Sequence, residues 1–315
     1  MNNSEKKEYY MQRLDESKIK DMDTLYKAIY GKRPEKNYFL KKYNTVYTEA
    51  QYLGHMAYDN ENNPIAFFGA IPCFIQYKKK ILLTAQGADV MTHPEHRYNG
   101  LFLKLAKLTF DLCKKSGINL IIGFASENSY HGCVNRLGFK MVDNMERFSI
   151  PVDTLPFGSL SERFKWSKWI YDKYTKWILR KYLLPQKGLP SSAINEECGG
   201  VIRSTEYLIN KTYNKTQVLK AGSAKVWFKI KNGFVIGDLD LPEQDFDNVI
   251  DEIKKIAKRL GIRGIFFQTS PGTQLHTLFI KKYSPKPSFP VIFLDLGADI
   301  PLNKLKFTFA DIDIF

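Results

Sequence analysis

The stretch His93–Phe102, with the sequence HPEHRYNGLF, lies between a predicted strand, Ile81–Met91, and a predicted amphipathic helix, Leu101–Lys115. Leucines recur in that helix at every third or fourth position, as expected for one buried face. The first N–H groups of a helix have no partner inside it, and the helix dipole places positive charge there. Gly100 allows a ligand to approach the backbone, and Arg97 can add charge-assisted hydrogen bonds. The stretch therefore predicts a site for a phosphate-bearing anion.

The segments around this stretch predict an α/β fold. Apolar runs broken by turn signals indicate strands, and apolar residues at helical spacing, closed by glycine, indicate helices. Strands followed by helix, strand, helix and strand form one central sheet with helices against it. The expected elements are helices within Met11–Asn44, strands Gln51–Tyr58 and Ile65–Tyr77, the strand and helix named above, strand Asn119–Ser126, helix Glu127–Leu137 and strand Val142–Ile150.

After Gly200 the chain repeats this pattern in a weaker form. At a constant offset of 144 residues, Gly117-Ile118 falls on Gly261-Ile262 and Ser126 falls on Ser270. Such a repeat predicts an internal duplication. The second copy has predicted strands at Val226–Ile230 and Phe234–Leu239, joined by an Asn-Gly turn, and a predicted helix at Phe246–Leu260.

The second copy lacks the features of an anion site. The same offset places Arg97–Gly100 opposite Leu241–Gln244, which has neither the arginine nor the glycine and contains a proline and a glutamate instead. Proline removes an N–H donor, and negative charge repels a phosphate. We therefore expect two domains, each a mixed central sheet flanked by helices, with the second degenerate. The expected boundaries are 1–150 for the first domain, 151–200 for a linker and 201–315 for the second domain.

The linker holds a basic, aromatic segment, 164–182. Trp166, Trp169 and Trp177 are three of the four tryptophans of the chain, and lysines and arginines alternate with them. This spacing predicts an amphipathic helix. Three readings stay open: a helix that connects the two domains, a peripheral contact with an anionic membrane surface or a lipid-linked substrate, and a platform on which nucleic-acid bases stack.

Composition excludes some classes of protein. A hydrophobic fraction of 44% excludes a disordered chain, and the absence of an apolar run of about 18 residues argues against a spanning helix. The polar start, Met1–Tyr10, does not resemble a secretory signal. Four scattered cysteines predict reduced thiols in a cytoplasmic protein. The net charge of +14 favours anionic partners, although solvated lysine faces explain it equally well.

The segment Gln51–Ile150 resembles the GNAT (GCN5-related N-acetyltransferase) superfamily. That family carries the motif Arg/Gln-x-x-Gly-x-Gly/Ala, and Arg97–Phe102 fits it except that Phe102 replaces the small last residue. Gly138-Phe139 matches the usual Gly-Phe that follows. The whole chain is similar to tandem-domain GNAT proteins related to the enhanced-intracellular-survival acetyltransferases, which implies two GNAT-like domains.

The resemblance implies that acetyl-CoA is the acyl donor. In the family, the motif amides hold the pyrophosphate, the end of the preceding strand pairs with the pantetheine arm, and an asparagine contacts the cofactor near the thioester. Carried onto this chain, the cofactor-binding residues are Val90, Met91, Thr92, Arg97, Tyr98, Asn99, Gly100, Leu101, Phe102 and Asn128.

The catalytic groups are less well defined by the sequence. The position where GNAT enzymes often have an acidic tyrosine is Val134, so Tyr130, one turn earlier, is either a substitute acid or a wall of the pocket. The candidate bases are Asp89, His131 and the C-terminal carboxylate of Phe315. Asp89 precedes the loop, and histidine titrates near neutral pH. The segment Phe307–Phe315 alternates like a strand, and related tandem enzymes can place their carboxyl terminus in the active site.

The leading hypothesis is an acetyl-CoA-dependent N-acyltransferase that acts on a small amine. An amino sugar or sugar nucleotide is preferred over an aminoglycoside-like polyamine or a peptide amine, because basic residues suit a phosphorylated acceptor. The alternatives are a non-catalytic coenzyme-binding module, a lipid-facing aminoacyl transferase with a tandem GNAT-like core, and a nucleic-acid-binding protein, which lacks a recognition motif. No metal is expected at His93 and His96, because no acidic or cysteine ligand is expected nearby.

Overall fold

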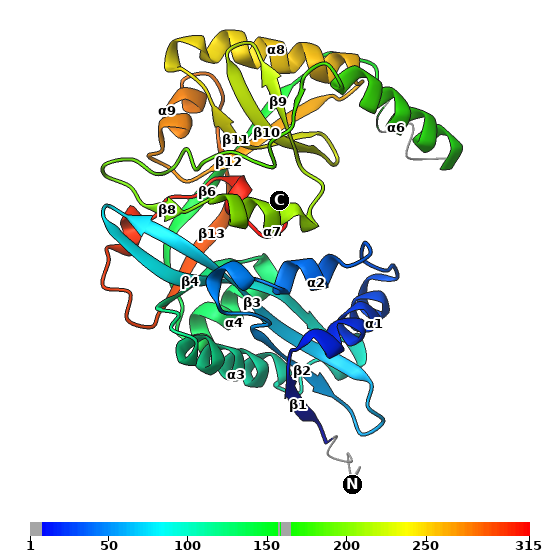
Figure 1. Cartoon of the computed structure of the whole chain (residues 1–315), viewed down its shortest axis with the longest axis vertical. Coiled ribbons are helices and arrows are strands. Elements are labelled where there is room, and N and C mark those ends of the chain that lie inside the picture. Colours follow the sequence, from blue (N-terminus) through cyan, green and yellow to red (C-terminus); the bar gives the residue numbers. More distant parts are fainter. Residues whose placement is uncertain (1–7, 157, 159–164) are drawn as a thin grey trace. The chain divides into compact units, whose positions relative to one another are not determined.

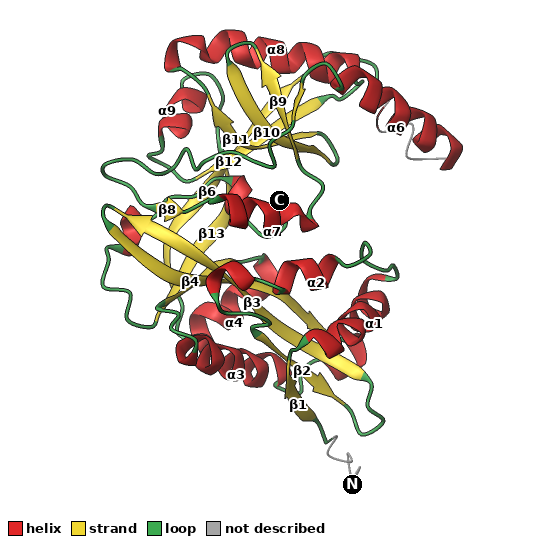
Figure 2. Cartoon of the chain, viewed as in Figure 1, coloured by secondary structure: helices red, strands yellow, loops and turns green. Residues whose placement is uncertain are grey.

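The computed structural model describes residues 8–156, 158 and 165–315, without the side chains of residues 128, 165 and 166. It has an α/β fold in which a large mixed sheet is flanked by helices (Figures 1 and 2), which confirms the predicted fold class. The residues form two compact units. Unit 1 consists of Met1–Ile75, Lys80–Val142 and Pro290–Leu302, and unit 2 consists of Gln76–Lys79, Asp143–Phe289 and Asn303–Phe315.

The units do not follow chain order alone, since unit 1 takes a segment from the C-terminal half of the chain. The boundaries proposed at residues 150 and 200 describe chain order and stay a prediction.

Unit 1 contains one sheet with helices on both faces. Its strand order is β1-β2-β3-β4-β5-β13, with β4 and β5 parallel and β13 antiparallel to β5. One core lies against α3 and α4, and a second core lies against α1 and α2. The strands are β1 (Tyr10–Arg13), β2 (Gly54–Tyr58), β3 (Pro64–Tyr77), β4 (Lys80–Thr92), β5 (Leu120–Phe124) and β13 (Lys286–Asp295), and the helices are α1 (Ile19–Tyr30), α2 (Tyr38–Tyr43), α3 (Leu101–Lys115) and α4 (Glu127–Leu137).

Unit 2 has the strand order β6-β12-β11-β10-β9-β7, and its core packs between this sheet and α8. The strands are β6 (Lys140–Pro151), β7 (Leu183–Leu184), β8 (Gly200–Val201), β9 (Gln217–Ala221), β10 (Ala224–Ile230), β11 (Phe234–Asp240) and β12 (Gly264–Thr269). The helices are α6 (Lys165–Leu179), α7 (Thr205–Asn210), α8 (Phe246–Arg259) and α9 (Gln274–Ile280). Short 3-10 turns lie at Glu16–Lys18, Val46–Thr48, Pro94–His96, Lys211–Tyr213, Glu243–Asp245, Leu302–Lys304 and Phe309–Asp311.

The predicted duplication agrees with the positions of the elements. Helices α3 and α4 have the bounds expected from the sequence. At the 144-residue offset, α3 falls on α8, β5 falls on β12, α4 overlaps α9, and β6 falls on β13. The chain therefore contains two copies of a helix–strand–helix–strand unit.

The two copies exchange their last strands. In unit 1, β5 pairs with β13, which belongs to the second copy. In unit 2, β12 pairs with β6, which belongs to the first copy. The registers are equivalent, because moving the pair Val291↔Phe124 by the offset gives Arg147↔Gln268, which is also observed. Each half of the chain thus supplies a strand to the sheet of the other half.

Two local predictions are wrong. Tyr10–Arg13 is an edge strand paired with β2, and the first helical turn starts only after Asp15, whose carboxylate accepts the Ser17 N–H. Phe307–Phe315 is not a strand, because Thr308 and Asp311 form a reciprocal capping box around a 3-10 turn. Such side-chain bonds to the backbone compete with strand pairing. The Phe315 side chain at the end of this segment is fully buried.

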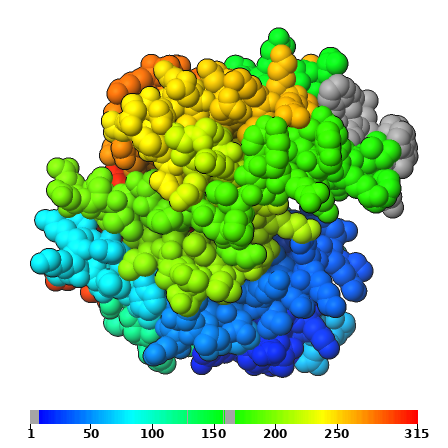
Figure 3. All heavy atoms as spheres, turned by 45° about the horizontal axis from the view of Figure 1, so that its top comes forward, coloured from blue at the N-terminus to red at the C-terminus, as the bar shows by residue number. Residues whose placement is uncertain are grey.

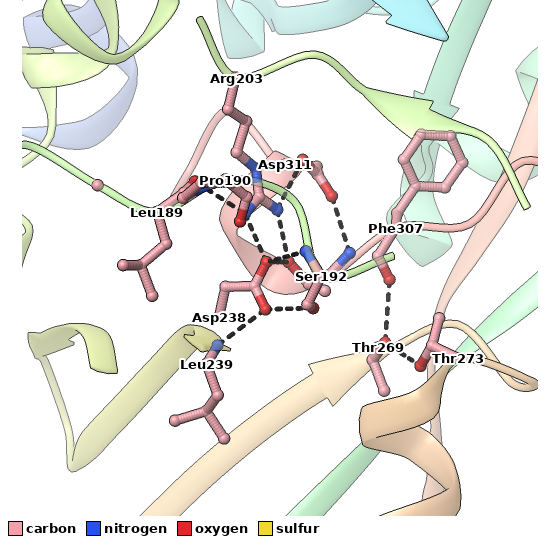
Figure 4. A network of polar contacts seen from close by, with 12 residues as sticks. Leu189, Pro190, Ser192, Arg203, Asp238, Leu239, Thr269, Thr273, Phe307 and Asp311 are labelled. Atoms are coloured by element: carbon pink, nitrogen blue, oxygen red, sulfur yellow. Dashed lines mark hydrogen bonds and ion pairs between the residues drawn. The ribbon is translucent and has the colours of Figure 1, made fainter. Parts of the chain in front are cut away.

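A buried ionic network fixes this C-terminal segment in unit 2 (Figure 4). The guanidinium of Arg203, which is fully buried, donates to the carboxylates of Asp238 and Asp311 and to the Thr308 hydroxyl. Asp311 also accepts the Thr308 N–H at 2.8 Å. Burial raises the pKa of Asp311, and the Arg203 charge opposes that rise. One cation therefore compensates two buried carboxylates.

We predict that Arg203→Met lowers the free energy of unfolding by about 3–5 kcal/mol, because it leaves two buried carboxylates without their cation. The control is Lys225→Met, which removes an exposed ion pair with Asp240 and is expected to cost less than about 0.5 kcal/mol. Urea denaturation of the full chain measures both values. Equal losses in the two variants would contradict the role assigned to the network.

Candidate functional site

The loop between β4 and α3 has a backbone shaped by two left-handed residues. Tyr98 has φ of 65° and Gly100 has φ of 72°, and Gly100 is the N-cap of α3. The Tyr98 side chain is fully exposed. No heavy atom would lie within 4 Å of a Cβ added to Gly100, so the space beside it is open. A ligand can therefore approach the backbone at this residue.

The amides at the start of α3 are free of protein partners among the described residues. The first bond of the helix runs from the Lys104 N–H to the Gly100 carbonyl at 3.2 Å, so the N–H groups of residues 101–103 point beyond the helix. Asn99 braces the loop through its side-chain amide, which donates to the carbonyls of His96 and Arg97, each at 3.2 Å. The Arg97 N–H makes a long bond of 3.4 Å to the Pro94 carbonyl. The predicted anion site is thus open.

The equivalent turn in unit 2 is closed and acidic. The Asp245 N–H donates to the Pro242 carbonyl at 3.1 Å, and the Phe246 N–H donates to the Glu243 carbonyl. Acidic side chains at residues 243, 245 and 247 also surround the start of α8. These contacts agree with the expectation that the second copy does not bind an anion there.

The strands β4 and β5 pair over only a short length. Their parallel register joins Ala85 to Ile121 and Gln86 to Ile122, whereas β4 continues to Thr92. The chain kinks at Asp89, where φ is 50°. Beyond this kink Val90 is exposed, Met91 is buried and Thr92 is half-buried. Among the described residues, the end of β4 therefore lies beside the loop and does not pair with β5.

Gln86 lies at the last position where the described part of β4 pairs with β5. Its side chain is 7% exposed, and its Nε2 atom has no hydrogen-bond partner among the described residues. A buried donor without a partner is costly, and such groups are often found where a ligand binds. Sequence reasoning missed this residue, although a glutamine within the apolar run Ile81–Met91 was a usable signal.

Asp89 forms a compact ionic cluster with α2. Its carboxylate lies 2.7 Å from the ammonium of Lys42, which is fully buried, and accepts the Tyr43 hydroxyl at 2.8 Å. Nothing in the sequence indicated these two partners. The carboxylate compensates a buried cation, which gives it a structural role.

The loop and this cluster both influence the titration of Tyr30. Burial raises the pKa of Tyr30, the negative charge of Asp89 adds to the rise, and the positive charges of Arg97 and Lys42 oppose it. Arg97 of the loop therefore acts on the same side chain as Asp89 and Lys42.

The remaining catalytic candidates of unit 1 lie on α4. The Tyr130 hydroxyl donates to the Met141 sulfur at 3.2 Å. His131 is exposed, and its ring centroid lies 5.7 Å from that of Tyr130. Val134 packs against the core. Asn128 lies on the same helix, but its side chain is outside the described residues.

Packing against α4 explains why Phe102 can stand where the GNAT motif has a small residue. A Cβ added to Gly132 of α4 would lie 2.8 Å from the Phe102 ring, and Phe102 also packs against Phe68 with ring centroids 5.8 Å apart. The large side chain in the motif thus occupies the space that a glycine leaves on the neighbouring helix.

The third base candidate, the C-terminal carboxylate, is held in unit 2. The Phe315 ring packs against Trp227 and lies where a Cβ on Gly237 would be, and the Asn214 side chain donates to an oxygen of the Phe315 carboxylate at 2.6 Å. The proposed role of this carboxylate as a base stays a hypothesis.

The expectation that no acidic ligand lies near His93 and His96 is wrong. Candidate ligand atoms of His93, Glu95 and His96 lie within 4.8 Å of one another. Part of this closeness has a local cause, since the His93 ring accepts the Glu95 N–H at 3.4 Å and the His96 ring contacts the Tyr9 hydroxyl at 3.3 Å. These contacts also explain how the turn before the loop is held.

Comparison with protein families agrees with this geometry. Residues 11–142 match the family model of the acetyltransferase (GNAT) domain. The match spans β1 to the start of β6 and includes the whole loop. This part of the chain is therefore similar to a GNAT acetyltransferase domain. No curated protein matches the sequence.

Solved structures share the fold over most of the chain. A conserved protein from Enterococcus faecalis V583, described as a probable N-acyltransferase, has a TM-score of 0.60 at 13% identity and covers 92% of this chain and 73% of its own. A GCN5-related N-acetyltransferase from Kribbella flavida has a TM-score of 0.58 at 12% identity, and the match covers 94% of this chain and 73% of that enzyme. N-myristoyltransferase from Saccharomyces cerevisiae, with bound myristoyl-CoA, has a TM-score of 0.54 at 12% identity, and the match covers 91% of this chain and 79% of that enzyme. At these identities the likeness concerns the fold.

We predict that Gly132→Ala destabilises unit 1 by about 1–3 kcal/mol, because the added methyl group overlaps the Phe102 ring. Without that contact, alanine in a helix would stabilise the protein. Adding Phe102→Leu is expected to restore most of the loss. The control is Asn135→Ala on the exposed side of α4. A Gly132→Ala variant as stable as Asn135→Ala in urea denaturation would contradict the packing explanation.

Proposed function

We propose that this protein transfers an acyl group from acetyl-CoA to the nitrogen of a small amine. The observation that carries the proposal is the set of open amides at the start of α3, in a domain that matches the GNAT acetyltransferase model. Free N–H groups, a helix dipole and Arg97 fit the pyrophosphate of a coenzyme A thioester. A degenerate unit 2 in the same chain supports the tandem type of GNAT protein.

The residues that would hold the coenzyme follow the loop and the end of β4. The N–H groups of 98–102 and the Arg97 guanidinium would bind the pyrophosphate. The end of β4, Val90–Thr92, would pair with the pantetheine arm, and Asn128 would contact the region near the thioester. Gln86, whose Nε2 atom is buried without a partner, would donate to a carbonyl of the donor or the acceptor.

Acyl transfer needs two proton movements. The amine nitrogen forms a bond to the thioester carbonyl carbon and loses a proton, while the C–S bond breaks and the thiolate gains one. Tyr130 is suited to give the second proton, because its present acceptor, a thioether sulfur, is a weak one. His131, beside Tyr130 on α4, is suited to accept the first. Positioning and backbone donors supply the rest of the catalysis.

The acceptor is proposed only as a small amine. The preference for an amino sugar rested on basic charge, and none of the described contacts selects a sugar. Val134, in place of the usual tyrosine, favours the second candidate, a coenzyme-binding module without activity. A transfer assay with radiolabelled acetyl-CoA and a mixture of amines separates the two, since only an enzyme produces labelled amide.

We predict that Arg97→Glu combined with Gly100→Val weakens acetyl-CoA binding at least about 100-fold, because it adds a repulsive charge, strains the loop and closes the approach to the amides. Titration calorimetry measures the affinity. The control is Gly117→Val at the other end of α3, where φ is 78° and the space is equally open. Tight binding by the double variant would refute the loop assignment.

A second prediction separates a structural role of Asp89 from a catalytic one. Asp89→Asn leaves the buried Lys42 ammonium without its carboxylate, so we expect a loss of about 3–5 kcal/mol in unfolding free energy. Adding Lys42→Met removes the cation and is expected to restore both stability and acyl transfer. If the double variant folds and binds acetyl-CoA but turns over at least 100-fold more slowly, Asp89 is the base after all.

A further inference from the structure

Helix α6 is attached to unit 2 along one side. Ile178 and Leu179 are buried in the core of that unit. The hydroxyls of Tyr171 and Tyr174 donate to the carbonyls of Leu260 and Arg259, at 2.8 and 2.7 Å, where α8 ends. The orientation of the helix is therefore fixed, and so is the side that faces away from the core.

The outer side of α6 carries large apolar side chains that nothing in the described part of the chain covers. Trp169 is 59% exposed, Ile170 is 51% exposed and Trp177 is 69% exposed. At about 100° per residue these three side chains fall within one arc of roughly 100°. Figure 3 shows this helix, in green, at the surface of the molecule. A contiguous exposed patch of this kind marks an interaction surface.

Cations accompany the aromatic rings. The Lys173 ammonium lies 3.7 Å from the centroid of the Trp169 ring. At the C-terminal end of the helix, a hollow of about 410 Å³ is lined by Trp177, Ile178, Arg180, Lys181 and Arg259. This hollow combines an indole ring with three positive charges, which is the chemistry that binds a phosphate next to an apolar phase.

We propose that the outer side of α6 docks on an anionic membrane surface. Tryptophan prefers the interface of a bilayer, where its ring is apolar and its N–H stays wet. Lysine and arginine beside it pair with lipid phosphates, and the hollow receives one headgroup. The net charge of +14 adds attraction to such a surface. Within the described residues no helix is long and apolar enough to cross a membrane.

A bilayer fits this surface better than nucleic acid does. A base-stacking surface needs rings presented to single bases along a cationic groove. Here Ile170 lies beside the tryptophans on a convex helix, which suits insertion among lipid headgroups. The proposal does not depend on the proposed acyl transfer.

The test is sedimentation of the full chain with vesicles of equal parts phosphatidylcholine and phosphatidylserine, and with vesicles of phosphatidylcholine alone. We expect binding to the anionic vesicles, a blue shift of tryptophan fluorescence and release by high salt. Trp169→Ala with Trp177→Ala, and separately Arg180→Glu with Lys181→Glu, are expected to reduce binding at least tenfold.

The matched control is Lys254→Glu with Lys255→Glu, which makes the same change of net charge on α8, at two lysines that pair with Asp251 and Glu252, and is expected to bind within about twofold of the wild type. The unfolding midpoint and acetyl-CoA affinity of the α6 variants are expected to equal those of the wild type. No binding to anionic vesicles, equal losses in the control variant, or inorganic phosphate or a DNA duplex displacing the vesicles at micromolar concentration would each overturn the proposal.

Discussion

The reciprocal pairing of β5 with β13 and of β12 with β6 is the constraint on which the rest of the structure depends. An unpaired edge strand is a template for aggregation, and in each unit the strand that covers this edge comes from the other half of the chain. The equivalence of the two registers means that the same pattern of backbone hydrogen bonds covers the edge of β5 in unit 1 and the edge of β12 in unit 2. The open loop at the start of α3 is built on the sheet that this pairing completes.

The two copies differ at the turn that precedes α3 in one and α8 in the other. At the start of α3, Gly100 is left-handed and the following amides are open; at the start of α8, residues 242–246 bond to one another and carry acidic side chains. The helices, the strands and the exchange occur in both copies, whereas the open amides occur at the start of α3. In unit 2, Arg203 and its two carboxylates hold the C-terminal segment.

Much of the fold was predictable from local patterns. The bounds of α3 and α4, the loop between β4 and α3 and the offset of 144 residues all follow from periodicity, glycine positions and turn residues. The exchange of β6 and β13 could not be predicted, because a strand pattern does not specify its partner. The ion pair of Asp89 with Lys42 could not be predicted for a similar reason, since it joins β4 to α2 across 47 positions of the chain. The strand expected at Phe307–Phe315 failed because Thr308 and Asp311 satisfy the backbone locally.

The exchange also has a consequence for biosynthesis. β13 leaves the ribosome roughly 170 residues after β5, which at about 5–20 residues per second is a delay of roughly 10–30 s. During that interval the nascent N-terminal half exposes the edge of β5 that β13 later covers. Chaperone binding to the nascent chain would protect this edge until translation supplies the missing strand.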